Sequence, residues 1–336
     1  MYANKKRMNH DMAVSPIVAT LVLIVVAVIG AVAVGTIMGT FSTDVSKQAN
    51  AGQAASASQT NVLMAGSTTI QPAMLLVAAD YMAANPGVKI TVQGGGSGAG
   101  LQSVAAGIAD IGMFSQAMDT TQTTAYPNVK QFTVGYGGVV AIYNNGTTPL
   151  TATQFGNTTD LKGFYTTGKT YNPVYATGLA PTEIVTRSDI SGTADSFGSY
   201  IGLSSGAIYT TTNNGATAKN GNGDMNTEVK GHAGALGFTD LDYALTASGY
   251  TYLPWDNIGG GKAGSYTTTY TYKDVRDAKN GIASTFPVGA VRPLELLTNG
   301  QPSALENSII QFTTSPSEAA QFHSINLVHA SDVVTL

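Results

Sequence analysis

The chain contains no cysteine, so disulfide bonds, iron–sulfur clusters and thiolate metal sites are all excluded. Charged residues make up only 11% of the 336 residues, whereas about a quarter is usual. The four histidines lack the spacing of metal ligands, and the net charge of −4 disfavours nucleic acid as a partner. Glycine and small hydroxyl residues replace the missing charges, which is typical of an extracytoplasmic surface. We therefore expect no metal and no cofactor.

The first 60 residues differ from the rest of the chain. Lys5, Lys6 and Arg7 precede an uncharged run at 12–43, whose centre at 17–41 is almost wholly apolar. As a helix this run is long enough to cross a bilayer, and the basic residues before it place everything after it outside. We expect a leader at 1–12, a transmembrane helix at 13–45 and a flexible linker at 46–60.

The charged leader and the sequence Met-Ala-Val-Ser-Pro at 12–16 resemble the signal of archaeal type IV pilin-like proteins. The resemblance covers residues 1–45 and implies cleavage between Met12 and Ala13, just before the apolar helix. A plain signal anchor is the alternative. Glycines along the helix would allow close packing, so a homo-oligomer formed through this helix is a further expectation.

From residue 61 onward, strand-like and helical patterns alternate. Strands are expected at 61–65, 88–93, 108–113, 139–143, 183–186, 233–239 and 291–298. Helices are expected at 70–84, 99–107, 304–313 and 316–322, and directly after Thr193. The alternation predicts an α/β fold with a largely parallel sheet and ligands at the carboxyl ends of strands. Two lobes are expected, one formed by 61–143 with 245–336 and the other by 144–244.

Three short loops share one design, in which a strand leads into glycine and hydroxyl residues and then into a helix. They are GSTT at 66–69, GGGSG at 94–98 and RSDISGT at 187–193. A helix start carries unpaired N–H groups and the positive end of the helix dipole, so each loop suits an anion. Three such loops, one with an arginine, predict a single anion held between converging helix ends.

The glycine loop at 94–98 also comes close to other signatures. It follows a strand, as in dinucleotide-binding folds, but Asp110 comes too early to be the acidic residue of such a fold. No Gly-Lys-Ser/Thr follows, and Ala99 stands where a nucleophile elbow has its last glycine. A glycine-rich turn without a ligand remains an alternative. No acid–base or nucleophile pair emerges, so we expect no enzyme.

The loop at 187–193 gives a sharper signal. The Arg187 guanidinium can hold two oxygens of a tetrahedral anion, and Asp189 can steady it. The hydroxyls of Ser191 and Thr193, with the N–H groups around Gly192, can complete a cradle for the anion. The alternative is a surface salt bridge at a helix cap.

Several segments, taken together and in this order, resemble the phosphate-binding protein of ABC-type phosphate transporters. They are GSTTIQP, VKITVQGGGSGAG, ADIGM, TRSDISGTADSF, GALGF, VRPLELLTNGQPS and FTTSPSEAAQF, which lie within residues 62–330. The resemblance implies a two-lobed periplasmic-binding-protein-like type II fold that closes on phosphate and passes it to an ABC permease. By position it assigns ligand contacts to Ser67, Thr68, Thr69, Ser97, Gly98, Arg187, Ser191, Gly192 and Thr193.

One departure from the family concerns Gln116. Shortly after the ADIGM segment, relatives place an arginine or an acidic residue, and the acid accepts the proton of hydrogen phosphate and so rejects sulfate. This chain has Phe114, Ser115 and Gln116 there. Asp119 is nearby but does not align with the position of the acid in the relatives. Discrimination between phosphate and sulfate therefore does not follow from this position.

Two functions fit these features. The first is a phosphate-binding protein tethered to an archaeal cell surface, with an extracytoplasmic binding domain that serves an ABC transporter. The second is a pilin-like filament or surface subunit that carries such a domain. Acceptor sequons at Asn145 and Asn157 would suit a glycosylated surface, but such tripeptides also arise by chance in a chain rich in Asn and Thr.

Overall fold

The computed structural model of the protein describes residues 59–204, 206–255 and 269–334. Its α-helices are α2 (Gln71–Ala84), α3 (Ser97–Ala105), α4 (Thr120–Ala125), α5 (Thr158–Thr167), α6 (Gly192–Tyr200), α7 (Gly221–Gly231), α8 (Leu241–Thr246), α9 (Tyr272–Lys279), α10 (Ala304–Thr314) and α11 (Ala319–Ser324). Its strands are β1 (Thr60–Gly66), β2 (Val88–Gly94), β3 (Ile111–Phe114), β4 (Val129–Tyr143), β5 (Glu183–Arg187), β6 (Thr217–Lys219), β7 (Ala235–Asp240), β8 (Thr251–Tyr252), β9 (Val291–Asn299) and β10 (Val328–His329). Short 3₁₀ helices are η1 (Ala207–Asn214), η2 (Val288–Ala290), η3 (Pro316–Glu318) and η4 (Ala330–Asp332).

The predicted leader, the transmembrane helix and nearly all of the linker lie outside the described residues. Within the described ranges, no helix combines the length and the apolar character that crossing a membrane requires.

The alternation of strands and helices is confirmed, with one strand much longer than predicted. β1, α2, β2 and α3 follow one another as the sequence indicates. β4, by contrast, runs from Val129 to Tyr143, whereas the pattern predicted only residues 139–143. Its first part contains Gly135, Gly137 and Gly138, and glycine is depleted in strands, so the sequence gives a weak signal there.

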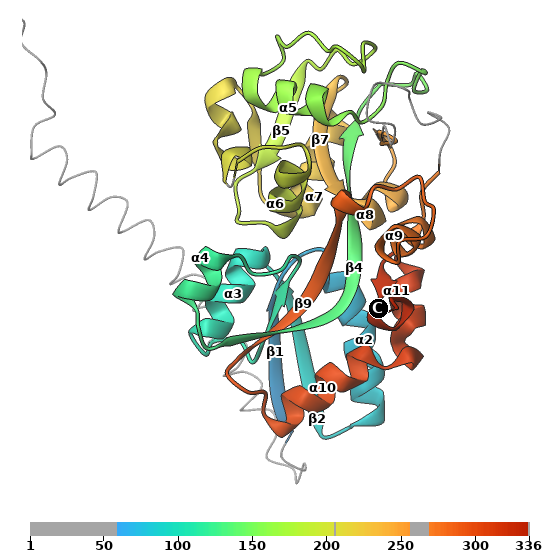
Figure 1. Ribbon diagram of the computed structural model, residues 1–336. Coiled ribbons are helices and arrows are strands. Elements are labelled where there is room, and N and C mark those ends of the chain that lie inside the picture. The colour runs from blue at the N-terminus through green and yellow to red at the C-terminus, as the bar shows by residue number, and fades with distance from the viewer. Residues whose placement is uncertain (1–58, 205, 256–268, 335–336) are drawn as a thin grey trace, which may run out of the picture. The chain divides into compact units, whose positions relative to one another are not determined.

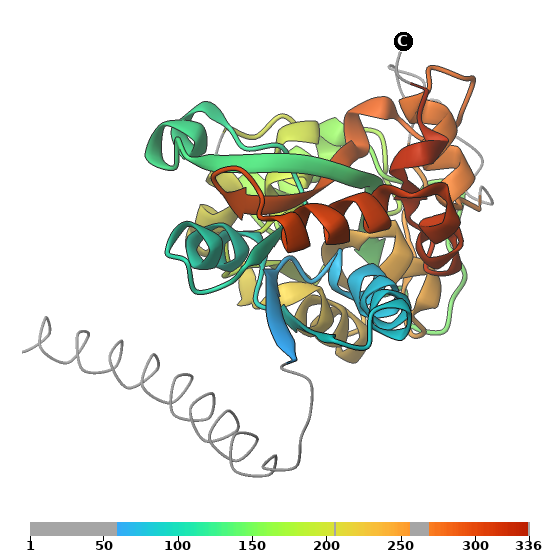
Figure 2. The same cartoon turned by 90° about the horizontal axis from the view of Figure 1, so that it is seen from below.

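β4 connects the two halves of the sheet (Figures 1 and 2). The strand order is β2-β1-β3-β9-β4-β7-β5-β6, and β8 and β10 also pair with β4. β9 pairs with residues 129–138 of β4, and β7 pairs with residues 139–143, both antiparallel. The expectation of parallel pairing holds for β1 with β2 and β3, and for β5 with β6 and β7. It is wrong at the centre, because β9 returns from the far end of the chain and runs antiparallel to β3 and β4.

The buried apolar side chains form two large clusters. One draws on residues 62–134 and 294–327 and includes Met74 of α2. The other draws on residues 139–290 and Val328, and includes Trp255. The chain therefore passes from one cluster to the other within β4 and returns near the start of β9. The lobe limits given from the sequence stay a prediction.

Side-chain caps fix where several helices begin. Capping boxes start α4, α9 and α10, formed by Asp119 with Gln122, Thr271 with Asp274, and Ser303 with Glu306. Asn157 caps α5 from a buried position, and its side-chain oxygen accepts from the N–H groups of Thr159 and Asp160. The burial of this side chain disfavours a glycan on Asn157, whereas glycosylation of Asn145 stays a prediction.

Glu295 is a buried carboxyl group in the central strand β9. It is 5% exposed, and among the described residues only one of its oxygens has a partner, the hydroxyl of Thr133 at 2.8 Å. Burial, opposed only by that hydrogen bond, raises the pKa of Glu295 to about 6. The unfolded chain releases this proton near pH 4.5 but the folded chain holds it until about pH 6, so stability falls as the pH rises through this window.

We predict that Glu295→Gln stabilises the protein by about 1–2 kcal/mol at pH 7.5, because the variant no longer buries a charge. The gain should shrink to about 0.4 kcal/mol at pH 4.5, where the folded wild-type protein holds the proton and about half of the unfolded chains hold it. Denaturant unfolding at the two pH values measures the difference. Glu306→Gln, a change in the partly exposed capping box of α10, is the control and should show no such pH-dependent gain. Equal stability of Glu295→Gln and wild type at pH 7.5 would contradict the prediction.

Candidate functional site

The three predicted loops meet at one place. They follow β1, β2 and β5, and each leads into the start of a helix, α2, α3 or α6. We call the predicted ligand contacts that they carry, apart from Arg187, the cradle: Ser67, Thr68, Thr69, Ser97, Gly98, Ser191, Gly192 and Thr193. All are buried except Thr68, which is partly exposed.

Direct contacts join the loops of the cradle. The N–H of Gly98 donates to the carbonyl of Ile190 at 3.1 Å, and the N–H of Gly192 lies 3.4 Å from Ser97 Oγ. The hydroxyl oxygens of Thr69 and Thr193 lie 3.4 Å apart. Residues separated by more than 90 positions are thus brought within hydrogen-bonding distance.

Glycine is needed where the loops pack closely against neighbouring segments, because a side chain would not fit there. A Cβ atom at Gly192 would lie 2.4 Å from the carbonyl oxygen of Ser115, and one at Gly98 would lie 2.6 Å from Ile190 Cβ. Gly96, the residue before α3, has a φ of 86°, a conformation that side chains disfavour. The glycines therefore allow two helix starts to come close enough to face one small ligand.

Arg187 lies beside the cradle and is only 1% exposed. Its Nε and Nη2 donate to the two carboxylate oxygens of Asp189 at 2.7 and 2.6 Å, as the sequence suggested, and its Nη1 donates to Asn222 Oδ1 at 2.7 Å. These bonds use three of the five N–H protons of a guanidinium. The expected salt bridge is therefore present, but it is buried at the cradle and not at the surface.

A second buried ion pair, which the sequence analysis missed, joins the cradle. Asp240 is fully buried, and its Oδ1 pairs with Nη2 of Arg292. Nη2 of Arg292 also lies 3.0 Å from the hydroxyl oxygens of both Thr69 and Thr193, and its Nη1 donates to the carbonyl of Ser115. One guanidinium therefore contacts four separate segments of the chain.

The pairing of β4 explains why Arg292 and Asp240 meet. Arg292 lies opposite Gly137, and Asp240 lies opposite Val139. Residues two apart on a strand point to the same face, so their cross-strand neighbours do as well. The sequence held a hint, since Arg292 stands in an otherwise mostly apolar strand, but only the register brings it to Asp240.

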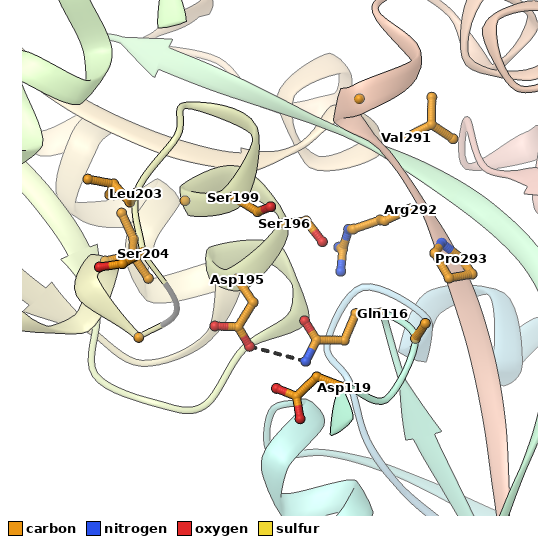
Figure 3. Close-up of a pocket in the computed structure, with 15 residues that line it drawn as sticks. Gln116, Asp119, Asp195, Ser196, Ser199, Leu203, Ser204, Val291, Arg292 and Pro293 are labelled. Carbon is orange, nitrogen blue, oxygen red and sulfur yellow. Dashed lines mark hydrogen bonds between the residues drawn. The ribbon is translucent and has the colours of Figure 1, made fainter. Parts of the chain in front are cut away.

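Gln116 does not contact the cradle. Its side-chain amide donates to Asp195 Oδ2 at 3.1 Å, whereas the preceding residue, Ser115, has its hydroxyl 3.0 Å from that of Ser97. Both Gln116 and Asp195 line a cavity of about 400 Å³, shown in Figure 3, whose wall also includes Arg292. Burial raises the pKa of Asp195, an effect opposed by its hydrogen bonds from Tyr209 and Gln116.

Asp242 is a second buried acid close to Asp240. It is 4% exposed, and its Oδ1 has no partner in the described part of the chain. Burial, followed by the charge of Asp240, raises the pKa of Asp242 well above its usual range. Of this pair of acids, Asp240 is the one that has a cationic partner, Arg292.

One group of potential metal ligands occurs in the described ranges, away from the cradle. Ligand atoms of Glu183, Glu228 and His232 lie within 4.8 Å of one another. The carboxylates already have partners, because Glu228 pairs with Lys219 at 2.7 Å and Glu183 accepts from Thr217 at 2.6 Å. A cation would have to compete with the Lys219 ammonium, so this group is no basis for a metal site.

Comparison with known proteins identifies the family. Residues 51–285 match the family model of the PBP superfamily domain. The chain belongs to this superfamily. It is 30% identical over 239 residues to the phosphate-binding protein PstS of Xylella fastidiosa strain Temecula1, and 29% identical over 239 residues to the protein of the same name from strain 9a5c. Each match covers 65% of this chain and 64% of the length of the curated relative.

Solved structures share the fold. A structure described as a phosphate ABC transporter substrate-binding protein with bound phosphate, from Clostridium perfringens, matches with a TM-score of 0.64 and 21% identity, over 80% of this chain and 99% of that one. An ABC-type phosphate transport receptor from Vibrio cholerae matches with a TM-score of 0.57 and 22% identity, over the same shares of the two chains. The periplasmic-binding-protein-like α/β fold expected from the sequence is confirmed.

We predict that Gly192→Ala destabilises the protein by about 1–3 kcal/mol, because the new methyl group would overlap the Ser115 carbonyl and force the loops apart. Denaturant unfolding measures the change. Gly223→Ala is the matched control, since Gly223 lies exposed in α7 with nothing within 4 Å of the added methyl group. That control should be neutral or stabilised by up to about 1 kcal/mol. A Gly192→Ala protein as stable as the control would contradict the close approach of the loops.

Proposed function

We propose that this protein is an extracytoplasmic solute-binding protein that captures phosphate, or a similar tetrahedral oxyanion, in the cradle. The observation that carries the proposal is the convergence of three hydroxyl-rich loops and two buried arginines in a chain of the PBP superfamily. The names of the curated relatives support phosphate as the ligand.

The chemistry of the cradle suits a dehydrated oxyanion. The starts of α3 and α6 offer backbone N–H groups and the positive ends of two helix dipoles, and serine and threonine hydroxyls add further donors. Arg187 has two guanidinium protons beyond those used by Asp189 and Asn222, so it can still donate to an anion. Neutral donors bind a buried anion without adding the cost of burying several cations.

We further propose that the protein delivers its ligand to an ABC permease, as the family resemblance implies. The uncharged run at residues 12–43 would tether it to the membrane with the binding domain outside, and a homo-oligomer could form through this segment. A pilin-like surface subunit is the second candidate, and it rests on the sequence of residues 1–45 alone.

We predict that Arg187→Ala weakens phosphate binding by the full chain by roughly 10-fold to 100-fold, because a charge-assisted hydrogen bond is lost. Isothermal titration calorimetry measures the affinity. Arg276→Ala is the matched control, since it removes the same charge from a partly exposed ion pair with Asp277 and should leave binding unchanged. If the wild-type chain binds neither phosphate, arsenate nor sulfate, the proposed function is wrong.

We predict that the full chain, expressed in cells, stays in the membrane fraction after an alkaline carbonate wash, because an apolar helix remains in the bilayer when peripheral contacts are removed. Immunoblotting of pellet and supernatant measures the distribution. A peripheral protein of the same cells serves as the control and should be released. Recovery of this chain in the supernatant would remove the tethering part of the proposal and leave anion binding untouched.

A further inference from the structure

The cavity in Figure 3 adjoins the cradle. Arg292 lines the cavity, and its Nη2 lies 3.0 Å from the hydroxyl oxygen of Thr193 in the cradle. Gln116 lines the cavity as well, and the residue before it, Ser115, has its hydroxyl 3.0 Å from that of Ser97 in the cradle. One guanidinium and the loop that carries Gln116 therefore border both spaces.

The size of this cavity suits an organic substituent. Its volume is about 400 Å³, and sites for whole organic ligands span roughly 300–1,000 Å³. A phosphate ion is a single small tetrahedron, so an ion held in the cradle would make no use of this space. The side chain of Gln116 turns into the cavity wall and bonds to Asp195, so it does not close the cradle on this side. A group attached to the bound tetrahedron would therefore enter the cavity.

Two carboxyl groups give the cavity wall a negative character. Asp195 in α6 and Asp119 at the start of α4 both line it, together with the hydroxyl groups of Ser196 and Ser199 (Figure 3). Each oxygen of a carboxylate can accept more than one hydrogen bond, so Asp195 can accept from a ligand while it accepts from Gln116. The wall therefore suits an ammonium group, which brings three donors and a positive charge.

Arg292 is the cationic residue among the described residues of this wall, and its charge already has a partner. Its Nη2 pairs with Asp240, whose other oxygen accepts from the hydroxyls of Thr69 and Thr193 at 2.6 and 2.8 Å. The Nε of Arg292, by contrast, has no partner within the described residues, and the side chain is only 3% exposed. A buried N–H without an acceptor costs free energy, so an ester oxygen of a ligand at the cavity wall would be a favourable partner.

We propose that the ligands of this protein include phosphate monoesters whose alcohol carries an ammonium group. The inference rests on the proposed function and names a further substrate class for the same site. The phosphoryl group occupies the cradle, and the ammonium group lies in the cavity against Asp195 and Asp119. A diester, such as a lipid headgroup, would have to place its second substituent among the buried residues of the cradle, so the proposal is limited to monoesters.

The test measures the affinity of the full chain for phosphoethanolamine and propyl phosphate by titration calorimetry at pH 7.5. Propyl phosphate has the same shape, with a methyl group in place of the ammonium group. Wild type should bind phosphoethanolamine at least about threefold more tightly than propyl phosphate. Asp195→Asn keeps the shape of the side chain and can still accept from Gln116, but it removes the charge. It should bring the ratio of the two affinities close to one.

Asp277→Asn is the matched control, since it removes the same charge from a partly exposed ion pair with Arg276 outside the cavity wall. It should keep the wild-type ratio, and thermal unfolding checks that both variants fold. Equal affinity of wild type for the two esters would overturn the inference, as would an unchanged ratio in a folded Asp195→Asn.

Two further titrations of wild type separate this inference from the proposed function and from a lipid source. Glycerophosphoethanolamine, a diester, should bind at least about tenfold more weakly than phosphoethanolamine, and equal binding of the two would overturn the proposed ligand class. A wild type that binds phosphate but no ester would overturn the inference and leave the proposed function intact. A wild type that binds neither phosphate, arsenate nor sulfate would refute the proposed function instead.

Discussion

The pairing of β4 with two different strands is the constraint on which the rest of this structure depends. β9 pairs with residues 129–138 and β7 with residues 139–143, so one strand holds both halves of the sheet in register. A shift by one residue in either pairing would turn the side chains of that strand to the opposite face. Arg292 and Asp240 would then point away from each other, and each would be a buried charge without its partner.

The site combines strong local charge with a composition poor in charge. Two buried arginines, Arg187 and Arg292, each have a buried or partly buried aspartate as partner, Asp189 and Asp240. Such pairs contribute little net stability, but removing one partner leaves an uncompensated charge and is costly. Their main consequence here is positional, because the carboxylates hold the guanidinium groups and the hydroxyl protons of the cradle in defined places.

The local parts of the site could be predicted, since each is encoded in a few consecutive residues. The loops at 66–69, 94–98 and 187–193 combine strand, glycine, hydroxyl and helix-start signals, and all three lie where the pattern places them. The pairing of Arg187 with Asp189 also follows from their spacing. β4 was predicted only in part, because three glycines lower the strand propensity of its first ten residues. Asp240 and Arg292 carried no local signal of a partner, since 51 residues separate them along the chain.

The sequence by itself determined the α/β alternation, the helix starts and the chemical nature of the cradle, because these depend on propensities and caps that act within a few residues. Only the tertiary structure decided which charges face the cradle and that Gln116 turns away from it. Those outcomes depend on strand register and on packing between distant segments, and neither the spacing nor the composition of the chain specifies them.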